Sequence, residues 1–341
     1  MPTNHAAYLV GAKRHPLEVK EAPYPSVEAN TVIVRNYAVA INPVDWKLQT
    51  YAFLPLNYPT ILGSDAAGVV VQVGSGVTNV VEGQRVIGYC VGTGIGDLRY
   101  AGFQEYSVMP ANAVAPIPDS ISYEQGAVLP LAICTAAAGL YQKDHLSLPY
   151  PADSIKHNEG TILIWGGSSS VGTASVQLSR ASGFEVISTA SVHNHDLVKS
   201  LGASEVFDHA SKSVVSEVVA ALKGKQVVGV FDCISEEETQ KKCAEILVKC
   251  DAAKKLLSLV LPAVDGLPSE VTVNSLFATT ILSNGVATAI WQDYLPKALK
   301  TGEFKPAPQA LVVGTGLEFI QEAIEKNKAG LSASKAVVKL S

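Results

Sequence analysis

One short stretch limits what this chain can fold into more than any other: an apolar run, a turn of small residues and a helical segment follow one another. The run Thr161–Trp165 is typical of a buried strand, and the turn Gly166–Gly172 reads Gly-Gly-Ser-Ser-Ser-Val-Gly. Because these residues lack bulk, backbone amides can approach a pyrophosphate, and the positive end of the following helix, Val171–Ser182, would face it. The stretch therefore predicts a dinucleotide site formed by Gly166, Gly167, Ser168, Ser169, Ser170 and Val171. Since Ser168 departs from the strict GxGxxG pattern, an ordinary strand-to-helix turn is the alternative.

Strands and helices alternate along the middle third of the chain. Strand-like runs and helical segments follow the turn in order: Phe184–Thr189, Asp196–Leu201, Gly229–Cys233, Glu236–Lys249 and Lys255–Leu261. Such alternation is typical of βαβ units, whose strands form a parallel sheet. We therefore predict an α/β fold with a doubly wound parallel sheet over residues 127–277.

The first third of the chain is rich in short strands instead. Thr31–Ala40 alternates in polarity, and the Val-rich run Ala66–Val73 ends in a Gly-Ser-Gly turn, a pattern that predicts a small barrel. The last third returns to mixed structure, with expected helices and a closing strand at Ala287–Leu299, Leu317–Lys328 and Lys335–Leu340. We therefore expect one domain formed by residues 1–126 and 278–341, with the α/β domain inserted into it. Lys143–Asn158, rich in Pro, Asp and His, is expected to be an irregular loop.

Composition narrows the class of protein. Hydrophobic residues make up 48% of the chain and charged residues 17%, a balance that supports a large folded core. Because the net charge is −5 and no basic patch stands out, nucleic acid is not an expected partner. We find neither a secretory signal in Met1–Leu9 nor an apolar run long enough to span a membrane. The five scattered cysteines suit a reduced, cytoplasmic compartment, and without zinc spacing they predict no metal site.

The end of the second predicted strand bears on the choice of cofactor. An NAD-binding chain usually places Asp or Glu there to bind the ribose hydroxyls, whereas this chain has Thr189-Ala190-Ser191, followed by His193 and Asn194. A 2′-phosphate would meet no repelling acid, and Ser191 and Asn194 could donate hydrogen bonds to it. The sequence therefore favours NADPH, with Lys199 as the nearest cation; an ordinary loop is the alternative reading.

Beyond the turn, a series of short segments resembles one superfamily. These segments are Asn42–Lys47 (Asn-Pro-Val-Asp-Trp-Lys), Gly63–Gly68 (Gly-Ser-Asp-Ala-Ala-Gly), Gly83–Val86, Gly102–Tyr106, Ile117–Asp119, Leu129–Ala136 and Lys199–Ala203. In this order they resemble the medium-chain dehydrogenase/reductase superfamily over nearly the whole chain. The resemblance implies a GroES-like barrel domain with an inserted Rossmann domain.

Within that superfamily the chain resembles the zinc-free branch. Zinc-dependent alcohol dehydrogenases carry Cys near the position of Asn42 and a His-Glu pair at Ser64-Asp65, and here those ligands are absent. The similarity is greatest to quinone oxidoreductases and to the fungal trans-acting enoyl reductases that serve polyketide synthases. Members of the latter group commonly have Tyr after Phe-Asp, whereas this chain has His209.

The resemblance also implies where a cofactor would lie. It assigns to the cofactor site, besides the glycine turn, Pro43, Val44, Asp45, Trp46, Thr135, Ser191, His193, Asn194, His209, Val260, Leu261, Lys335 and Ala336. The same resemblance implies a metal-independent reductase that delivers hydride to an activated C=C bond or to a quinone.

Such a reaction needs a proton source. Lys47 follows the cofactor-facing stretch at a position where many quinone reductases have Tyr, and Tyr51 is an alternative; Thr135 would approach from the hinge side. An exposed barrel lysine is the other interpretation of Lys47. We expect Asp45 and Asp65 to be structural carboxylates.

Three functions remain open from the sequence. They are an NADPH-dependent enoyl reductase acting on an enoyl thioester or enone, with a polyketide synthase as a possible partner; a quinone or aldehyde reductase of broad specificity; and a cofactor-binding protein with little catalysis. The chain is expected to be a monomer, or a homodimer if the Val-rich edge segment Glu270–Phe277 pairs with a second copy.

Overall fold

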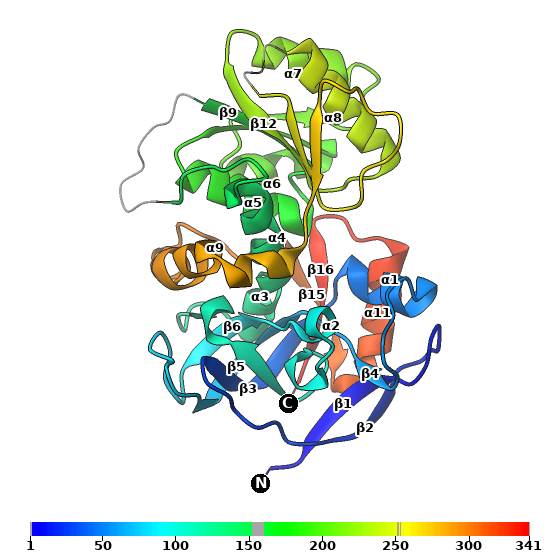
Figure 1. The fold of residues 1–341 in the computed structure, drawn as a ribbon, viewed down its shortest axis with the longest axis vertical. Coiled ribbons are helices and arrows are strands. Elements are labelled where there is room, and N and C mark those ends of the chain that lie inside the picture. Colours follow the sequence, from blue (N-terminus) through cyan, green and yellow to red (C-terminus); the bar gives the residue numbers. More distant parts are fainter. Residues whose placement is uncertain (1, 152–159, 251, 253, 341) are drawn as a thin grey trace. The chain divides into compact units, whose positions relative to one another are not determined.

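The structure, a computed structural model, describes residues 2–151, 160–250, 252 and 254–340. The chain divides into two compact units (Figure 1): unit 1 consists of residues 1–131 and 291–341, and unit 2 of residues 132–290. Of the expected loop Lys143–Asn158, residues 152–159 lie outside the described residues, and residues 143–151 form neither helix nor strand.

Unit 2 is built on a six-stranded sheet in which every neighbouring pair is parallel. The strands are β9 (Gly160–Trp165), β10 (Glu185–Ala190), β11 (Glu205–Asp208), β12 (Gln226–Asp232), β13 (Leu256–Leu259) and β14 (Thr272–Ser275). Their order is β11-β10-β9-β12-β13-β14, which reverses between β9 and β12. Such a switch point is where open parallel sheets bind ligands, beyond the carboxyl ends of the strands. The predicted parallel sheet is confirmed.

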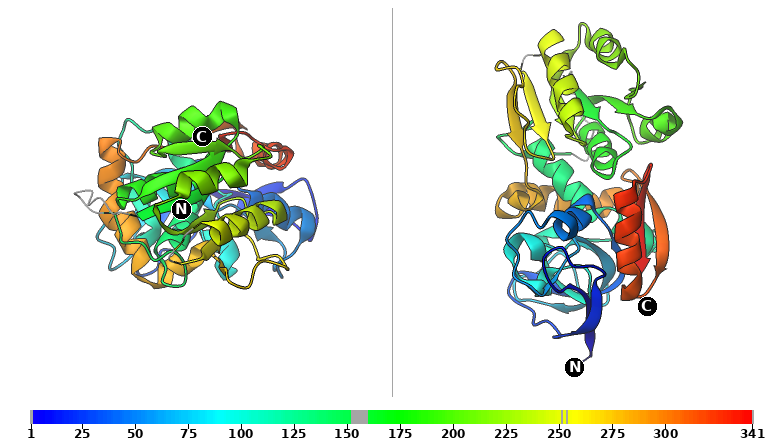
Figure 2. Two further views of the ribbon diagram at one scale, coloured as in Figure 1. Left: turned by 90° about the horizontal axis from the view of Figure 1, so that it is seen from above. Right: turned by 90° about the vertical axis from the view of Figure 1, so that its right-hand side faces the viewer.

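Helices connect these strands (Figure 2): α5 (Ser170–Ala181), α6 (His195–Ser200), α7 (Val214–Leu222) and α8 (Glu237–Lys249). All residues of β9 are buried, as expected for a central parallel strand covered on both faces. The sequence reading did not identify β11 or α7. β11 is only four residues long, and α7 begins Val-Val-Ser-Glu-Val-Val, whose β-branched residues suit a strand equally well.

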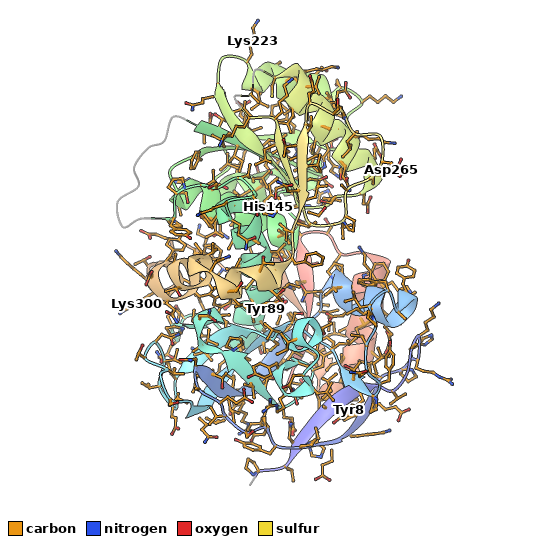
Figure 3. The ribbon with its side chains drawn as sticks, viewed as in Figure 1. Tyr8, Tyr89, His145, Lys223, Asp265 and Lys300 are labelled. Carbon is orange, nitrogen blue, oxygen red and sulfur yellow. The ribbon has the colours of Figure 1, made fainter. Side chains whose placement is uncertain are left out.

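A buried histidine fastens the segment after α4 (Pro130–Tyr141) to this sheet. His145 (Figure 3) places its Nδ1 2.8 Å from the Oγ of Ser258 on β13, and both side chains are buried. Burial disfavours the imidazolium and holds the pKa of His145 below its ordinary value, although Asp144 opposes this. A neutral ring is therefore part of the packed sheet.

Unit 1 contains two sheets. The larger joins β15 (Gln309–Thr315), β16 (Ser334–Lys339), β3 (Thr31–Ala40), β5 (Asp65–Val73), β6 (Arg85–Tyr89) and β8 (Val114–Pro116), with β7 (Tyr106–Pro110) also paired to β3. The smaller joins β2 (Glu18–Ala22), β1 (Asn4–Leu9) and β4 (Thr60–Ile61). β16 pairs antiparallel with β3, so strands from the first and the last third of the sequence lie in the same sheet.

Two expected helices differ from the structure. The segment expected as one helix over Ala287–Leu299 consists of α9 (Gly285–Ala287), a wider π-helical stretch over Thr288–Tyr294, and α10 (Leu295–Thr301). Pro296 lacks the N–H that a continuous α-helix would need, which explains why regular geometry restarts beside it. The second begins as a 3₁₀ turn and continues as α11 (Ile320–Ala329).

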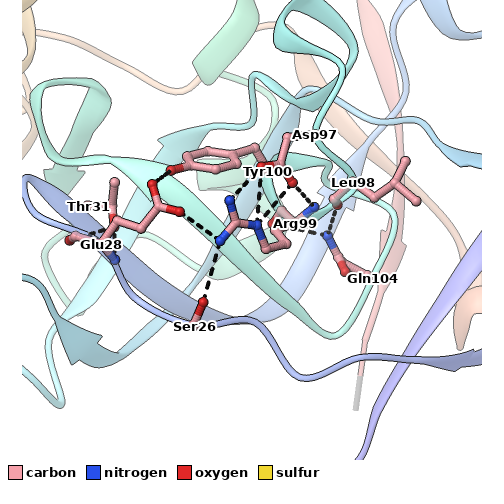
Figure 4. Close-up of polar contacts among 8 residues, drawn as sticks. All are labelled: Ser26, Glu28, Thr31, Asp97, Leu98, Arg99, Tyr100 and Gln104. Carbon is pink, nitrogen blue, oxygen red and sulfur yellow. Dashed lines mark hydrogen bonds and ion pairs between the residues drawn. The ribbon is translucent and has the colours of Figure 1, made fainter. Parts of the chain in front are cut away.

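An arginine fastens a surface segment of unit 1 (Figure 4). The Arg99 guanidinium bonds the Asp97 carboxylate, with an Nη2–Oδ2 distance of 2.6 Å, and pairs with Glu28 at 2.7 Å. Tyr100 donates from its hydroxyl to Glu28 at 3.1 Å. The Arg99 hydrogen bonds lower the pKa of Asp97. Since the three charged side chains are partly exposed, their ion pairs order the loop more than they stabilise the fold.

Candidate functional site

The glycine turn lies at the carboxyl end of β9, beside the switch point. The Gly166 N–H donates to Thr189 Oγ1 at 3.0 Å and the Gly167 N–H to the Thr189 carbonyl at 2.8 Å, so the turn is held against β10. Ser169 caps α5, because its Oγ accepts the Gly172 N–H at 3.0 Å. The predicted strand, turn and helix therefore follow one another as the sequence indicates.

The turn admits no larger residues at its glycines. Gly166 has a φ of +80°, which L residues rarely adopt. A Cβ on Gly172 would lie 2.1 Å from the Gly166 carbonyl oxygen, and one on Gly167 would lie 2.1 Å from Ser188 Oγ. Packing alone thus requires glycine here. The position of this tight turn at the switch point, before the N-terminus of α5, is what fits a dinucleotide pyrophosphate.

The predicted adenosine end gathers at the ends of β10 and β11. Ser191 Oγ lies 3.1 Å from His209 Nε2, and the Asn194 N–H donates to the Ser191 carbonyl at 2.8 Å. Asn194 is buried, whereas His193 and His209 are exposed. The structure brings Ser191, Asn194 and His209 together; their contact with a cofactor stays a prediction.

The ends of β12 and β13 are joined by a network that the sequence reading missed. The Asp232 carboxylate accepts the Ile234 and Ser235 N–H groups at 2.9 and 2.8 Å and the Thr239 hydroxyl at 2.6 Å. Burial raises the pKa of Asp232, while these hydrogen bonds oppose the shift. Ser235 Oγ in turn accepts the Val260 N–H at 2.9 Å. The network holds Val260, and with it the neighbouring Leu261, at the carboxyl ends of β12 and β13. The sequence signal for this network was Asp232, an acidic residue at the end of a buried strand.

In unit 1, the predicted stretch Pro43–Trp46 forms the first turn of α1 (Pro43–Tyr51). Asp45 is fully buried, and its carboxylate accepts the Asn42 N–H at 2.8 Å and the Gly63 N–H at 3.3 Å. The pKa of Asp45 is raised to about 7: burial and, less strongly, the charge of Asp65 raise it, while the two hydrogen bonds and the charge of Lys335 lower it. Asp45 therefore holds the start of α1 against the residues that precede β5.

A buried ion pair lies beside it. Lys335 Nζ is 2.6 Å from Asp65 Oδ2, and the two side chains are 3% and 0% exposed. Asn42 Nδ2 donates to the same carboxylate oxygen at 2.7 Å, and the Leu131 N–H donates to the other at 2.5 Å. Lys335 also donates to the Val128 carbonyl at 3.1 Å. In this way the Lys335 ammonium joins β16, β5 and the start of α4. The contact of Lys335 with a cofactor, which the family resemblance implies, stays a prediction.

The remaining predicted residue of β16 is buried as well. Ala336 has no exposed surface, and its carbonyl accepts the Ile41 N–H at 2.9 Å, just ahead of α1. Ala336 can therefore contact a neighbouring site only through its backbone or its methyl group.

The two predicted proton donors of unit 1 lie around one aromatic ring. Lys47 Nζ is 5.6 Å from the centroid of the Trp46 ring, and the Tyr51 ring meets Trp46 edge-on at 5.8 Å. Tyr51 is 59% exposed and Lys47 is half-buried, so both can reach a ligand. The third candidate, Thr135, is a buried residue of α4 in unit 2.

The described residues contain neither a metal-binding cluster nor a membrane-spanning helix. His, Cys, Asp and Glu do not gather there in any group of three or more that could hold a metal ion. In the same part of the chain, no helix combines the length and apolar character needed to cross a membrane.

Known proteins resemble this chain along its whole length. Residues 28–119 match the family described as "Alcohol dehydrogenase GroES-like domain", and residues 170–250 match "Zinc-binding dehydrogenase". The "Zinc-binding alcohol dehydrogenase domain-containing protein cipB" of Emericella nidulans is 46% identical, over 99% of this chain and 98% of its own. The "Trans-enoyl reductase himH" of Aspergillus japonicus is 42% identical, over 99% and 98%.

Solved structures share the fold. The crystal structure of Escherichia coli quinone oxidoreductase complexed with NADPH superposes with a TM-score of 0.72 at 20% identity, and the match covers 99% of this chain and 100% of that one. The GroES-like match agrees with unit 1, and the six-stranded parallel sheet agrees with a Rossmann-like unit 2. The chain therefore belongs to the medium-chain dehydrogenase/reductase superfamily, whose members are oxidoreductases that use NAD(P)H.

Proposed function

We propose that this protein is an NADPH-dependent reductase that delivers hydride to an activated C=C bond of an enoyl thioester or enone without a metal. One observation carries the cofactor choice: beside the glycine turn, β10 is followed by Ser191 and not by an acidic residue, and Ser191 Oγ lies 3.1 Å from His209 Nε2. A 2′-phosphate can take hydrogen bonds from this pair, whereas a ribose diol would lack its usual acidic partner. The fungal relative named a trans-enoyl reductase supports the choice of substrate.

The residues of the site divide the work. When bound, the reduced nicotinamide would supply a hydride to the β-carbon of the substrate. The α-carbon then needs a proton and the enolate oxygen needs a hydrogen-bond donor. Lys47 can hold that proton on Nζ and Tyr51 on Oη, and both side chains lie near the Trp46 ring. Asp45 and Asp65 are buried and bonded to backbone N–H groups, Asn42 and Lys335, so we assign them to positioning α1 and not to proton transfer to the substrate.

Steady-state oxidation of NADPH with three acceptors tests the proposal: a 2-enoyl thioester, a small enone and a quinone. We expect turnover of the thioester and a higher kcat/KM with NADPH than with NADH. Preference for the quinone would make the protein a quinone reductase, and tight NADPH binding without turnover would make it a binding protein. Preference for NADH would contradict the interpretation of Ser191 and His209.

The proton donors can be separated by substitution. If Lys47 supplies the proton, Lys47→Met lowers kcat by about 10²-fold or more, while Tyr51→Phe changes it little; the reverse result assigns the role to Tyr51. In both variants the affinity for NADPH serves as the control for an intact site.

A further inference from the structure

Three segments of unit 1 meet around the C-terminal end of α1. Gln49 Nε2 donates to the Arg14 carbonyl at 3.1 Å and to Gln321 Oε1 on α11 at 2.9 Å. Lys328, near the end of α11, donates from Nζ to Thr50 Oγ1 at 3.3 Å. The loop between β1 and β2, the end of α1 and the end of α11 therefore form one surface. We call it the α1 face and define it by Lys13, Arg14, Lys47, Phe53, Leu54 and Lys328.

The α1 face carries positive charge that the chain does not neutralise. Lys13, Arg14 and Lys328 are exposed, and none of them forms an ion pair within the described ranges. Lys326 on the same helix, by contrast, pairs with Glu322 at 2.9 Å. The acid Glu325 lies beside the face and accepts a hydrogen bond from Gln321. In a chain whose net charge is −5, this local excess of cations is a departure that suits an anionic partner.

Two exposed apolar side chains follow the end of the same helix. Phe53 is 54% exposed and Leu54 38%, and they come directly after Ala52, which caps the end of α1. The loop that carries them is anchored, because Leu56 and Tyr58 pack against the hydrophobic core of unit 1. Exposed aromatic and aliphatic residues with cations around them are typical of protein interfaces, in which the apolar residues supply most of the affinity and the charges speed association.

We propose that the α1 face docks an acidic acyl-carrier domain that presents the thioester substrate to this enzyme. The inference rests on the proposed reductase function, because a substrate held as a thioester arrives on a carrier. Acidic side chains of the carrier would meet Lys13, Arg14 and Lys328, and Phe53 and Leu54 would be covered. The site residues Trp46 and Lys47 belong to α1 itself. An acyl arm that a carrier extends from the C-terminal end of α1 therefore has a short path to them.

The test compares one 2-butenoyl group on two carriers: an acidic acyl-carrier domain from a fungal polyketide synthase, and the small thiol N-acetylcysteamine. We expect the variant K13E/R14E to lower kcat/KM for the carrier-bound substrate about tenfold and to leave kcat/KM for the small thioester within about twofold. K328E should act in the same direction. Wild-type kcat/KM for the carrier-bound substrate should also fall as salt is raised, because screening weakens the attraction.

The matched control is K223E/K300E, which reverses two exposed lysines outside the α1 face, one in unit 2 and one on α10 (Figure 3). It should not change either rate. Equal rates of K13E/R14E and wild type on the carrier-bound substrate would overturn the docking proposal. The proposal would also be wrong if K13E/R14E left the rate on the carrier-bound substrate unchanged but no longer sedimented with phosphatidylserine vesicles, as wild type would. In that case the α1 face would bind a membrane. No turnover of either thioester by wild type would instead overturn the proposed reductase function.

Discussion

Asp45 links the stability of unit 1 to pH. Burial raises its pKa from 3.8 to about 7, so between about pH 4 and pH 7 the folded chain holds a proton that the unfolded chain has released. Folding takes up a proton in this window, and the free energy of unfolding therefore falls as pH rises through it. The gap corresponds to at most about 4 kcal/mol, fully lost above pH 7.

Asp45→Asn should remove this dependence. Urea unfolding at pH 5, 6, 7 and 8 would measure the free energy of unfolding of both proteins. The value for wild type minus the value for D45N should fall as the pH rises, because only wild type loses stability. A difference that stays constant over this range would show that Asp45 is ionised throughout.

The ion pair of Lys335 and Asp65 makes a second prediction at the residue scale. Lys335→Met would leave the Asp65 carboxylate buried without its cation, which costs about 3–5 kcal/mol of unfolding free energy. Lys339 is the matched control on the same strand: it pairs with Glu124 at 2.9 Å at the surface, so Lys339→Met should cost less than about 1 kcal/mol. The double variant D65N/K335M should recover part of the loss. A small effect of K335M in urea unfolding would contradict the description of a buried pair.

At the scale of elements, the contact between the glycine turn and α5 is the most constrained. Gly172→Ala would place its Cβ 2.1 Å from the Gly166 carbonyl oxygen, so α5 must move away from the turn. We expect a loss of about 1–3 kcal/mol in unfolding free energy and a raised Kd for NADPH. Gly285→Ala is the control, because a Cβ there meets no atom closer than the Tyr150 hydroxyl at 4.0 Å. Calorimetry and a fluorescence titration would measure the two quantities, and unchanged NADPH affinity in G172A would separate the turn from the cofactor.

Elements that depend on neighbours in sequence were predictable, and those that depend on distant partners were not. Gly166–Gly172 and its flanking strand and helix follow from local pattern, because chain chemistry alone dictates a tight turn there. The short strand β11, which was not predicted, owes its existence to pairing with the longer strand β10. The Asp65–Lys335 pair joins opposite ends of the chain, and no spacing in the sequence indicates it.

The whole molecule raises the question of self-association, because β14 has a partner strand only on the β13 side within the described part of unit 2. An edge strand can pair with a second copy, yet β14 is only four residues long, and its flank carries the ion pair of Glu270 with Lys255 at 2.9 Å. Short edges with charges beside them resist such pairing. We therefore expect a monomer. Sedimentation over a hundredfold range of concentration should give a mass near 35.8 kDa throughout. If a dimer forms instead, Val273→Lys on β14 should dissociate it, and a dimer that survives this substitution would use a different surface.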